Sequence, residues 1–595
     1  MRQRVLLASN RGPFSYWFGA DGTPVARRGG GGLISGMTPG VAAVAAQAEV
    51  IWICAAFTDA DRAAAHQWDA GSGDPAGPQA VLGAQGTRIA GDVPVRMLDI
   101  ARDTFHRAYN NVANSILWFV HHMMFDTPHQ PRFGREFRRD WESYLAYNQA
   151  FADALAEQAM AEGAPREQAL RAGMRVLIQD YHLSLVPRLL RERLGDTARG
   201  VGVAHFSHTP WAPPRYCRLL PREVAGALLD GMLGADHLGF HAEWWAAAFL
   251  DCCEAILGAE VSRPGSADAV GRVVHRGHVT EVGVHPLGVD APALRARAAA
   301  GDVRGYVDAI SQVARGRKLI VRVDRTELSK NIVRGLAAYR ELLATRPEWH
   351  GRVLHLALAY PSRSAIPAYR AYTGQVRQIA QEIVEEFRTP DWNPLILEVR
   401  DDYPRSLAAC ALADVLLVNP VSDGMNLVAQ EGPVLSQRGC ALVLSREAGA
   451  AATLGDHALL VNPYDVSETA AALHQALAMP DAERQRRSAA LAGPPRRPRP
   501  PAGWGTRSRR WGRDTRGRSG QATAAQGGAV TSGPFRTRHI FCRTGRGACP
   551  RTPHSEGLPC FSTLPRCRCP ARPSPTPPGS SARHAPHSSP PHLSR

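Results

Sequence analysis

The chain has 595 residues and a formal net charge of +16. Residues 493–595 hold 19 Arg, no Lys and two acidic residues, whereas residues 1–492 hold 51 basic and 52 acidic residues. The length predicts two domains plus an extra segment, and the nearly neutral body excludes a protein built around binding to a polyanion such as nucleic acid.

The sequence has no features of a membrane or secreted protein. It contains no run of eighteen apolar residues, which a membrane-spanning helix would need. The apolar stretch near the start, residues 5–8, is too short for a signal peptide. Six cysteines precede residue 493 without the spacing of a disulfide framework, so we expect a cytoplasmic protein with reduced thiols.

Short apolar runs alternate with amphipathic segments up to about residue 487. Runs typical of buried strands occupy residues 4–9, 50–55, 175–179, 200–205, 318–323, 353–358, 415–419, 441–445 and 458–461. Helical patterns cover residues 136–159, 221–233, 331–346 and 369–387. This alternation is typical of α/β domains with mostly parallel sheets.

The order of these elements predicts two Rossmann-like domains. A loop-rich stretch at residues 262–290 precedes the strand at 318–323, where a second set of strands begins. We predict an amino-terminal domain over residues 1–290 and a carboxy-terminal domain over residues 291–492, facing each other across a cleft at their strand ends. Residues 493–595 are rich in Pro and Arg and lack periodicity, so we expect a disordered tail.

Polar residues follow three of the predicted strands in the amino-terminal half. Arg11 comes after the first strand, Asp180 after the strand at 175–179, and His208 after the strand at 200–205. In a parallel sheet these strand ends share one edge, so together the three residues predict a polar pocket suited to a sugar phosphate. Taken singly, each is more commonly a capping residue or a satisfied core group.

Two other patterns in this half are weaker. Glycines 29–32 would let a ligand approach the backbone closely, although a glycine-rich loop alone is weak evidence for binding. Asp59 and Asp61 have the spacing of a metal-binding pair, but they precede a helical pattern and are better explained by capping. We expect no metal and no cofactor.

Arg325 and Lys330 occupy a short turn between the strand at 318–323 and a helix that begins near Asn331. Free backbone N–H groups and the helix dipole favour anions at such a position. Two cations there could neutralise a leaving diphosphate, each charged hydrogen bond contributing roughly 1.5–3 kcal/mol. The alternative is a solvated loop with ordinary charges.

Asp423 lies in a loop after the strand at 415–419, and Glu431 follows about two helical turns later. Gly424 allows a tight turn before the helix predicted to begin at Met425. A loop carboxylate can accept hydrogen bonds from sugar hydroxyls, and a helical carboxylate in the cleft can hold a ribose diol. Alternatively, Asp423 caps the helix and Glu431 is a surface charge.

Taken in order, these motifs resemble those of the trehalose-6-phosphate synthase family, retaining glycosyltransferases of family 20 with the two-domain GT-B fold. The resemblance extends from about residue 4 to about residue 487, and its motifs are spread from residue 9 to residue 465. The matching segments are Ser9-Asn10-Arg11, Gly31-Gly32-Leu33, residues 114–118, Gln179-Asp180-Tyr181-His182, His208-Thr209-Pro210, Arg325 with Lys330, Pro361-Ser362-Arg363, residues 423–431 and Asn462-Pro463-Tyr464-Asp465.

The resemblance implies two ligand sets. Glucose 6-phosphate, the acceptor, would contact Arg11, Tyr109, Trp118, Asp180 and Arg363. A nucleotide-glucose donor, UDP- or GDP-glucose, would contact Gly31, Gly32, Arg325, Lys330, Asp423, Leu427, Val428 and Glu431. Arg325, Lys330 and Asp423 would also be catalytic, together with His208, whose counterpart lies near the reacting carbon. The family needs no divalent metal.

The implied reaction transfers glucose with retention to give α,α-trehalose 6-phosphate. Breaking the anomeric bond builds negative charge on the departing diphosphate, which Arg325 and Lys330 would stabilise as it develops. The leaving phosphate is thought to help deprotonate the acceptor. This would explain why the sequence shows no nucleophile-and-acid pair of the kind found in retaining glycosidases.

Three features depart from the family pattern. The phosphate loop, commonly Asp-Tyr-Ser-Lys-Gly, is Glu327-Leu328-Ser329-Lys330-Asn331, and the lysine that commonly precedes the glutamate is Gln430. These changes leave the donor base open between uridine, guanosine and adenosine, and the acceptor open beyond a phosphorylated sugar. The Pro/Arg-rich tail replaces a helix that crosses back onto the amino-terminal domain in the family, which predicts weaker domain docking.

Two alternatives remain. The first is a related transferase with another acceptor, such as a glucosylglycerol-phosphate synthase or an aminocyclitol-joining pseudo-glycosyltransferase. The second is a catalytically impaired paralogue, against which the retention of Arg325, Lys330, Asp423 and Glu431 argues. We expect no membrane partner and no specific nucleic acid, and the sequence leaves a homo-oligomer open.

Overall fold

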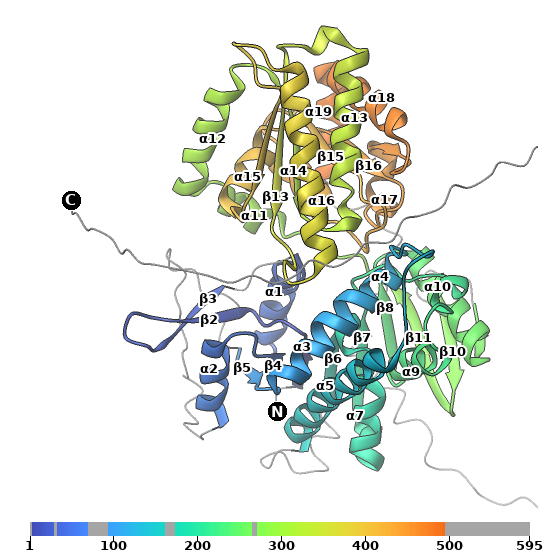
Figure 1. Ribbon diagram of the computed structural model, residues 1–595. Coiled ribbons are helices and arrows are strands. Elements are labelled where there is room, and N and C mark those ends of the chain that lie inside the picture. Colours follow the sequence, from blue (N-terminus) through green and yellow to red (C-terminus); the bar gives the residue numbers. More distant parts are fainter. Residues whose placement is uncertain (1–2, 29–31, 70–92, 161–172, 264–269, 494–595) are drawn as a thin grey trace, which may run out of the picture. The chain divides into compact units, whose positions relative to one another are not determined.

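Two main β-sheets organise the computed structural model (Figure 1), which describes residues 3–28, 32–69, 93–160, 173–263 and 270–493. The first sheet has nine strands in the order β5-β4-β1-β6-β7-β8-β11-β10-β9, and the second has six in the order β14-β13-β12-β15-β16-β17. All neighbouring strands are parallel except β9, β10 and β11, which pair antiparallel with one another. We call the elements from β1 to β11 the N-lobe and those from α11 to α19 the C-lobe.

The N-lobe combines the nine-stranded sheet with a separate hairpin formed by β2 and β3. Its strands are β1 (Gln3–Ala8), β2 (Phe14–Phe18), β3 (Pro24–Arg28), β4 (Ala48–Ala55), β5 (Val95–Leu98), β6 (Met174–Gln179), β7 (Val201–Phe206), β8 (His237–Phe240), β9 (Glu260–Ser262), β10 (Gly271–His275) and β11 (His278–Val284). Its helices include α1 (Gly32–Ala45), α2 (Asp59–Asp69), α3 (Arg102–His106), η1 (Arg107–Leu117), α4 (Trp118–His121), α5 (Arg135–Met160), η2 (Tyr181–Leu183), α7 (Val186–Leu194), α8 (Pro214–Cys217), α9 (Arg222–Met232), α10 (Glu243–Cys252) and η4 (Cys253–Leu257).

The C-lobe repeats the α/β arrangement around the second sheet. Its strands are β12 (Lys318–Arg325), β13 (Val353–Tyr360), β14 (Leu395–Val399), β15 (Val415–Val418), β16 (Ala441–Ser445) and β17 (Leu459–Val461). Its helices include α11 (Ala291–Ala298), α12 (Gly301–Ala314), η5 (Leu328–Lys330), α13 (Ile332–Thr345), α14 (Pro367–Phe387), α15 (Tyr403–Leu412), α16 (Val428–Leu435), α17 (Ala451–Leu454), α18 (Val466–Ala478) and α19 (Asp481–Ala492).

The C-lobe sheet is buried on both faces, which explains its continuous apolar strands. Successive side chains of a strand point to opposite faces. In β12, Leu319 and Val321 accordingly enter a core that also contains Leu294 of α11, whereas Ile320 enters a second core with Leu336 of α13. Helices therefore cover both sides of the sheet, as in a Rossmann-like domain.

All nine strands predicted from the sequence correspond to strands of the structure, as do the four predicted helices. The expectation of a loop-rich stretch at residues 262–290 was wrong, because β10 and β11 form a hairpin there. Arg276 and Gly277 make its tight turn, both with positive φ (51° and 72°). Such turns match the twist of paired strands. The buried side chains alternate with exposed ones in these short strands, a weaker signal than a continuous apolar run.

The start of α14 in the C-lobe packs into the core of the N-lobe. Ile366, which precedes the helix, and Tyr369 on its first turn belong to the same apolar cluster as Trp118 and Phe119. Among the described residues, the helices are all too short or too polar to cross a lipid bilayer. The predicted tail lies outside the described residues, apart from Gly493.

Candidate active site

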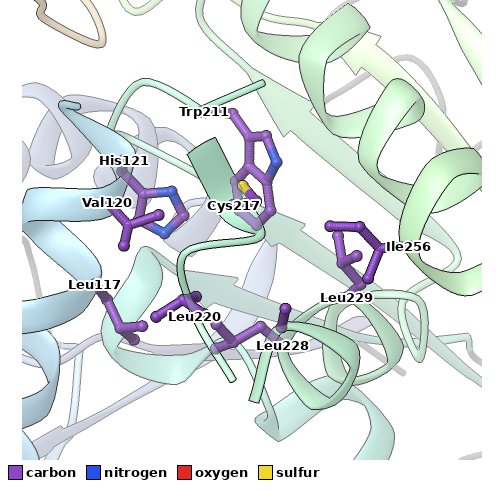
Figure 2. Close-up of a pocket in the computed structure, with 10 residues that line it drawn as sticks. Leu117, Val120, His121, Trp211, Cys217, Leu220, Leu228, Leu229 and Ile256 are labelled. Carbon is purple, nitrogen blue, oxygen red and sulfur yellow. The ribbon is translucent and has the colours of Figure 1, made fainter. Parts of the chain in front are cut away.

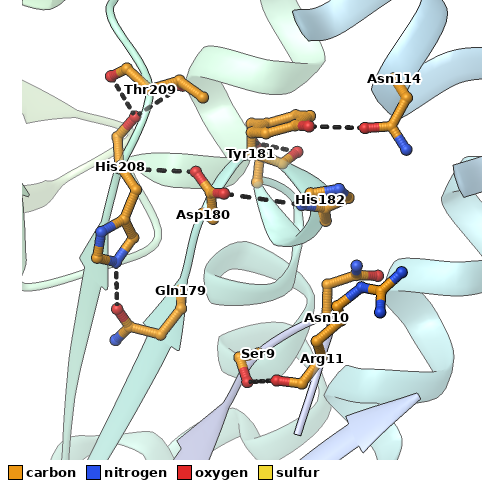
Figure 3. A network of polar contacts seen from close by, with 12 residues as sticks. Ser9, Asn10, Arg11, Asn114, Gln179, Asp180, Tyr181, His182, His208 and Thr209 are labelled. Carbon is orange, nitrogen blue, oxygen red and sulfur yellow. Dashed lines mark hydrogen bonds and ion pairs between the residues drawn. The ribbon is translucent and has the colours of Figure 1, made fainter. Parts of the chain in front are cut away.

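The carboxyl ends of β1, β6 and β7 lie at one edge of the N-lobe sheet, because β6 pairs in parallel with both neighbours. Arg11, Asp180 and His208 follow these three strands (Figure 3). The predicted convergence of the three strand ends is therefore confirmed. Polar side chains gather where open α/β sheets usually bind ligands.

Asp180 sits at this edge in a left-handed backbone conformation, with a φ of 72°. One carboxylate oxygen accepts a hydrogen bond from the backbone N–H of His208 at 3.2 Å. Burial raises the pKa of Asp180 to about 6, since its charged form is poorly solvated. This bond satisfies one oxygen of the carboxylate but is no helix cap, because the Asp180 side chain makes no capping hydrogen bond to η2.

Arg11 and Tyr109 lie in an aromatic cluster beside Asp180. The guanidinium of Arg11 is exposed and lies 4.2 Å from the ring centroid of Phe57. Tyr109 lies on η1 and stacks on His182, with ring centroids 5.6 Å apart. Burial opposes ionisation of Tyr109, yet the nearby Arg11 and Arg363 lower the pKa of its hydroxyl. This cluster therefore offers positive charge and a hydroxyl at one place, as a sugar phosphate requires.

Arg363 extends from the C-lobe to the N-lobe. Its Nη2 donates to the hydroxyl of Tyr181 at 3.1 Å, and that hydroxyl donates to Oδ1 of Asn114 at 2.8 Å. Its guanidinium also lies 5.3 Å from the ring centroid of Trp118, which is buried in the N-lobe. The structure thus brings together Arg363 and Trp118, which the sequence separates by more than two hundred positions.

Lys330 and Asp423 form a close ion pair between two loops of the C-lobe. Nζ of Lys330 lies 2.5 Å from Oδ2 of Asp423, and Asn426 donates to the same oxygen at 3.1 Å. Burial alone would lower the pKa of Lys330, but Asp423 raises it above its ordinary value. The lysine therefore stays charged at the end of η5, immediately before α13 begins.

The alternative role for Asp423 as a helix cap is not what the structure shows. Helix α16 begins at Val428, three residues later than the predicted start at Met425. Oδ1 of Asn426, and not Asp423, accepts from the N–H of Ala429 at 3.3 Å. Asp423 is thus free of a capping role and pairs with the lysine.

Glu327 is a buried carboxylate that sequence reasoning noted only as a departure from the family pattern. Its Oε1 lies 3.1 Å from Nη1 of Arg325 and 3.9 Å from Nη1 of Arg363, and it accepts from the hydroxyl of Ser362 at 2.9 Å. Burial opposes its ionisation, yet Arg325, Arg363 and Lys330 lower its pKa to about 2. Glu327 therefore anchors one arginine assigned to the donor and one assigned to the acceptor.

Arg322 and Asp324 form a buried ion pair beneath the same loop, and sequence reasoning missed it. Nε of Arg322 donates to Oδ2 of Asp324 at 2.8 Å, and Nη2 donates to the carbonyl of Lys330 at 2.6 Å. The two charges stand at alternate positions within the apolar stretch of β12 and therefore share one face, which was the available signal. The pair fixes the backbone that carries Lys330.

Asn331 stands at the position where the family loop commonly has glycine. It adopts a left-handed conformation with a φ of 58°, which asparagine accepts more readily than most residues. Its side-chain amide donates to the carbonyls of Asn419 at 3.0 Å and Pro463 at 2.6 Å. The asparagine therefore keeps the turn and ties it to two neighbouring loops.

Gly424 brings the loop of Asp423 against His208. A Cβ atom at Gly424 would lie 1.9 Å from the carbonyl oxygen of His208. Only glycine permits this approach between the two lobes. Of the predicted donor-loop glycines, Gly32 is the first residue of α1, and Gly31 lies outside the described residues.

Leu427, Val428 and Glu431 lie at the start of α16, as the N-cap residue and within its first turn. Burial raises the pKa of Glu431 to about 7. The carboxylate is thus held in an environment that disfavours its charge, which excludes the interpretation of an ordinary surface glutamate. A carboxylate whose ionisation is made unfavourable by burial is typical of a functional site, where it can bind a ligand.

Replacing Glu431 by glutamine should stabilise the protein at pH 8 by on the order of 1–3 kcal/mol. In the unfolded chain this carboxyl ionises near 4.5, and in the folded protein near 7. Between these values the folded state holds a proton that the unfolded state releases, so rising pH destabilises the native protein. The difference should vanish at pH 4, where both states are protonated.

Urea unfolding of the Glu431→Gln variant at pH 4 and pH 8 measures this effect. Glu348→Gln, at an exposed site, is the matched control and should change stability little at either pH. An equal stability of Glu431→Gln and the parent protein at pH 8 would contradict the assigned burial cost.

Asp61 caps helix α2, as the capping interpretation predicts, whereas Asp59 pairs with Arg102. Oδ2 of Asp61 accepts from the N–H of Thr58 at 2.8 Å, while the N–H of Asp61 donates to the hydroxyl of Thr58 at 3.0 Å. This reciprocal pattern is a capping box. Within the described residues, no group of three His, Cys, Asp or Glu side chains is arranged to hold a metal ion.

A small apolar pocket in the N-lobe is not a substrate site. Figure 2 shows that it is lined by side chains such as Leu117, His121, Trp211 and Cys217. The space is no larger than about one water molecule requires. Such a cavity can hold neither a sugar nor a nucleotide, so the polar strand ends remain the candidate site.

Comparison with known proteins agrees with this arrangement. The family model described as glycosyltransferase family 20 matches residues 53–493. The chain belongs to glycosyltransferase family 20. It is thus a glycosyltransferase of the hexosyltransferase type, similar to trehalose-phosphate synthases.

Two similar family 20 proteins come from fungi. The α,α-trehalose-phosphate synthase (UDP-forming) of Schizosaccharomyces pombe is 32% identical over 395 residues, covering 66% of this chain and 71% of that protein. The protein of the same description from Emericella nidulans is 29% identical over 483 residues, covering 81% of this chain and 86% of that protein.

Solved structures of family 20 proteins show the same architecture. An α,α-trehalose-phosphate synthase (UDP-forming) from Burkholderia vietnamiensis has a TM-score of 0.65 and 28% identity, covering 82% of this chain and 93% of that chain. The E. coli protein bound with UDP-2-fluoro glucose has a TM-score of 0.65 and 27% identity, covering 82% and 94%. The expected GT-B fold with two Rossmann-like domains is therefore confirmed.

Proposed function

We propose that this family 20 chain transfers glucose from UDP-glucose to glucose 6-phosphate and forms α,α-trehalose 6-phosphate with retention at the anomeric carbon. The observation that carries the proposal is the buried pair of Lys330 and Asp423, 2.5 Å apart at the start of α13. A cation for a diphosphate and an acceptor of sugar hydroxyl protons then lie side by side. The S. pombe relative described as UDP-forming supports the choice of uridine as the donor base.

The donor would lie along the C-lobe loops. Arg325 and Lys330 would bind its diphosphate, because two cations beside the start of a helix favour that negative charge. Asp423 would accept hydrogen bonds from the transferred glucose, and Glu431 would hold the ribose. The other proposed donor contacts are Gly31, Gly32, Leu427 and Val428.

The acceptor would lie at the N-lobe edge. Arg11 and Arg363 would bind the phosphate of glucose 6-phosphate, each through charge-assisted hydrogen bonds. The side chains of Tyr109, Trp118 and Asp180 would line the sugar. Arg363 reaches this edge from the C-lobe, and it lies 5.3 Å from the Trp118 ring centroid, so the acceptor pocket would draw on both lobes.

In the transfer, the bond between C1 of glucose and the diphosphate oxygen breaks, and its electron pair stays on that oxygen. The acceptor hydroxyl oxygen forms the new bond to C1 on the same face, and its proton passes to the departing phosphate. Arg325 and Lys330 would stabilise the negative charge that grows on the diphosphate. They would thus lower the activation barrier of the transfer rather than only strengthen substrate binding. His208 would lie near C1.

We also propose domain limits at residues 1–290 and 291–492, and a cytoplasmic location. Leu294 of α11 packs in the same apolar cluster as Leu319 of β12, which supports placing α11 with the C-lobe. The cysteines of the described segments are free and buried, as expected in a reducing compartment.

A donor-by-acceptor screen tests the proposed function on the full-length protein. UDP-, GDP- and ADP-glucose are each combined with glucose 6-phosphate, glucose and glycerol 3-phosphate, and the products are identified by NMR of the anomeric protons. We expect the highest turnover with UDP-glucose and glucose 6-phosphate, and a product whose single glycosidic linkage joins two anomeric carbons of α configuration. Preferred transfer to glycerol 3-phosphate, or no transfer to any sugar phosphate, would contradict the proposal.

A further inference from the structure

A chain of hydrogen bonds runs across four neighbouring strand ends of the N-lobe sheet. Nε2 of His208, after β7, lies 2.9 Å from Oε1 of Gln179 at the end of β6. Nδ1 of His208 lies 3.2 Å from Nε2 of His241, after β8, and the N–H of Leu287, after β11, meets Nδ1 of His241 at 3.4 Å. Strands β6, β7, β8 and β11 are consecutive in the sheet.

The contact with Leu287 sets the direction of the hydrogen bonds in this series. A backbone N–H can only donate, so Nδ1 of His241 must accept from Leu287 and its proton must sit on Nε2. That proton is donated to Nδ1 of His208, whose own proton must then sit on Nε2 and be donated to the amide oxygen of Gln179. Only neutral imidazoles of this tautomer satisfy all three contacts.

The surroundings favour the neutral forms. Burial lowers the pKa of His241 to about 4, and burial together with His241 and His205 lowers the pKa of His208 well below its usual range. The carboxylate of Asp423 and the ring of His285 are the other ionisable groups near His241. Asp180 faces the backbone N–H of His208 rather than its ring.

We propose that His208 takes part in transfer as a neutral imidazole with its proton on Nε2, and that His241 and Gln179 are positioning residues that fix this form and its orientation. Both ring nitrogens are engaged within the protein, so the side chain has no free nitrogen with which to exchange a proton with a substrate. A neutral ring also adds no positive charge beside C1, where positive charge develops. The catalytic part of the inference rests on the proposed function.

The same series of hydrogen bonds reaches the C-lobe through Gln430. Its Nε2 donates to the carbonyl of Leu287 at 2.9 Å, and its neighbour is Glu431, the proposed ribose ligand. Gln430, which stands where the family commonly has lysine, thus holds Leu287, and the N–H of Leu287 donates the first hydrogen bond of the series. We call this series, from Leu287 through His241 and His208 to Gln179, the relay. The protonation state of His208 therefore depends on the contact between the two lobes.

Three variants and one control test the relay. His241→Phe removes the donor, while His241→Gln places an amide nitrogen where Nε2 was. Gln179→Glu supplies a carboxylate that would favour a charged His208. His350→Gln is the control, since His350 contacts the carbonyl of Leu343 in the C-lobe, away from the relay. Thermal unfolding establishes that each variant is folded.

We expect His241→Phe to lower kcat by about 10- to 100-fold with little change in KM, and His241→Gln to recover most of the loss. Gln179→Glu should make kcat fall as the pH is lowered below neutrality, because His208 then gains a proton. His350→Gln should behave as the parent enzyme. A folded His241→Phe variant with unchanged kcat would overturn the positioning role.

Nitrogen-15 NMR of histidine-labelled protein tests the tautomer without any substrate. The His208 signals, identified by their loss in His208→Gln, should show a protonated Nε2 and a bare Nδ1 at pH 7. A proton on Nδ1, or on both nitrogens, would overturn the inference. If the parent protein transfers no glucose, the proposed function fails while this measurement still decides the state of His208.

Discussion

Replacing Lys330 by alanine should lower kcat for glucose transfer by at least about 10²–10³-fold, the loss expected when one group that stabilises the departing charge is removed. Nζ of Lys330 lies 2.5 Å from Asp423, and the carbonyl of Lys330 is held by Arg322. The variant also leaves Asp423 buried without its cation, so some loss of stability should accompany it. Release of UDP and formation of the disaccharide phosphate measure the rate.

The chain provides a matched control, because Lys318 and Lys330 are its two lysines. Lys318 lies at the start of β12, 3.6 Å from Asp414. Lys318→Ala removes the same kind of side chain and should leave transfer within about twofold of the parent rate, as for most changes outside a site. Near-normal turnover by a folded Lys330→Ala protein would contradict the role of Lys330 at the diphosphate.

Arg363→Ala should raise KM for glucose 6-phosphate by about 100-fold or more, because two charged hydrogen bonds at roughly 1.5–3 kcal/mol each would be lost. The effect on kcat and on KM for UDP-glucose should be smaller. Initial rates over a range of both substrates separate these quantities. The side chain of Arg363 is only 13% exposed and contacts Tyr181 and Trp118, so the variant is also checked by thermal unfolding.

Arg370→Ala is the matched control for Arg363. Arg370 lies on the first turns of α14, is exposed and donates to the carbonyls of Ser364 and Ala365. It should bind neither substrate, so KM for glucose 6-phosphate should not change. An unchanged KM in Arg363→Ala would remove Arg363 from the acceptor pocket, and an equal rise in both variants would point to the fold of this segment instead.

Glu327 links Arg363 to Arg325, the arginine proposed to bind the donor diphosphate. The same oxygen of Glu327, Oε1, contacts both Arg325 and Arg363. The arginine proposed for the donor and the one proposed for the acceptor therefore share one ion-pair partner. The family pattern has aspartate here, and the longer glutamate reaches Ser362 as well. This shared contact is a physical reason why neither arginine can be replaced without some effect on the other.

The sequence alone determined the α/β architecture and most of the polar residues at the strand ends. Apolar runs such as residues 353–358 and 415–419 are typical of strands buried on both faces, and Arg11, Asp180 and His208 follow such runs directly. The parallel order of β1, β6 and β7 was enough to bring them to one edge. Short amphipathic strands such as β10 and β11 carry too few residues for their periodicity to stand out.

Only the tertiary structure decided which distant groups meet. The pairing of Lys330 with Asp423, the reach of Arg363 to Tyr181, and the relay through His241 join residues that are 93, 182 and 33 positions apart. Each contact depends on which strands are neighbours and on how the two lobes pack, because burial and hydrogen-bond geometry are set by the folded arrangement and not by spacing along the chain. The protonation of His208 follows from those contacts, so no local pattern could have predicted it.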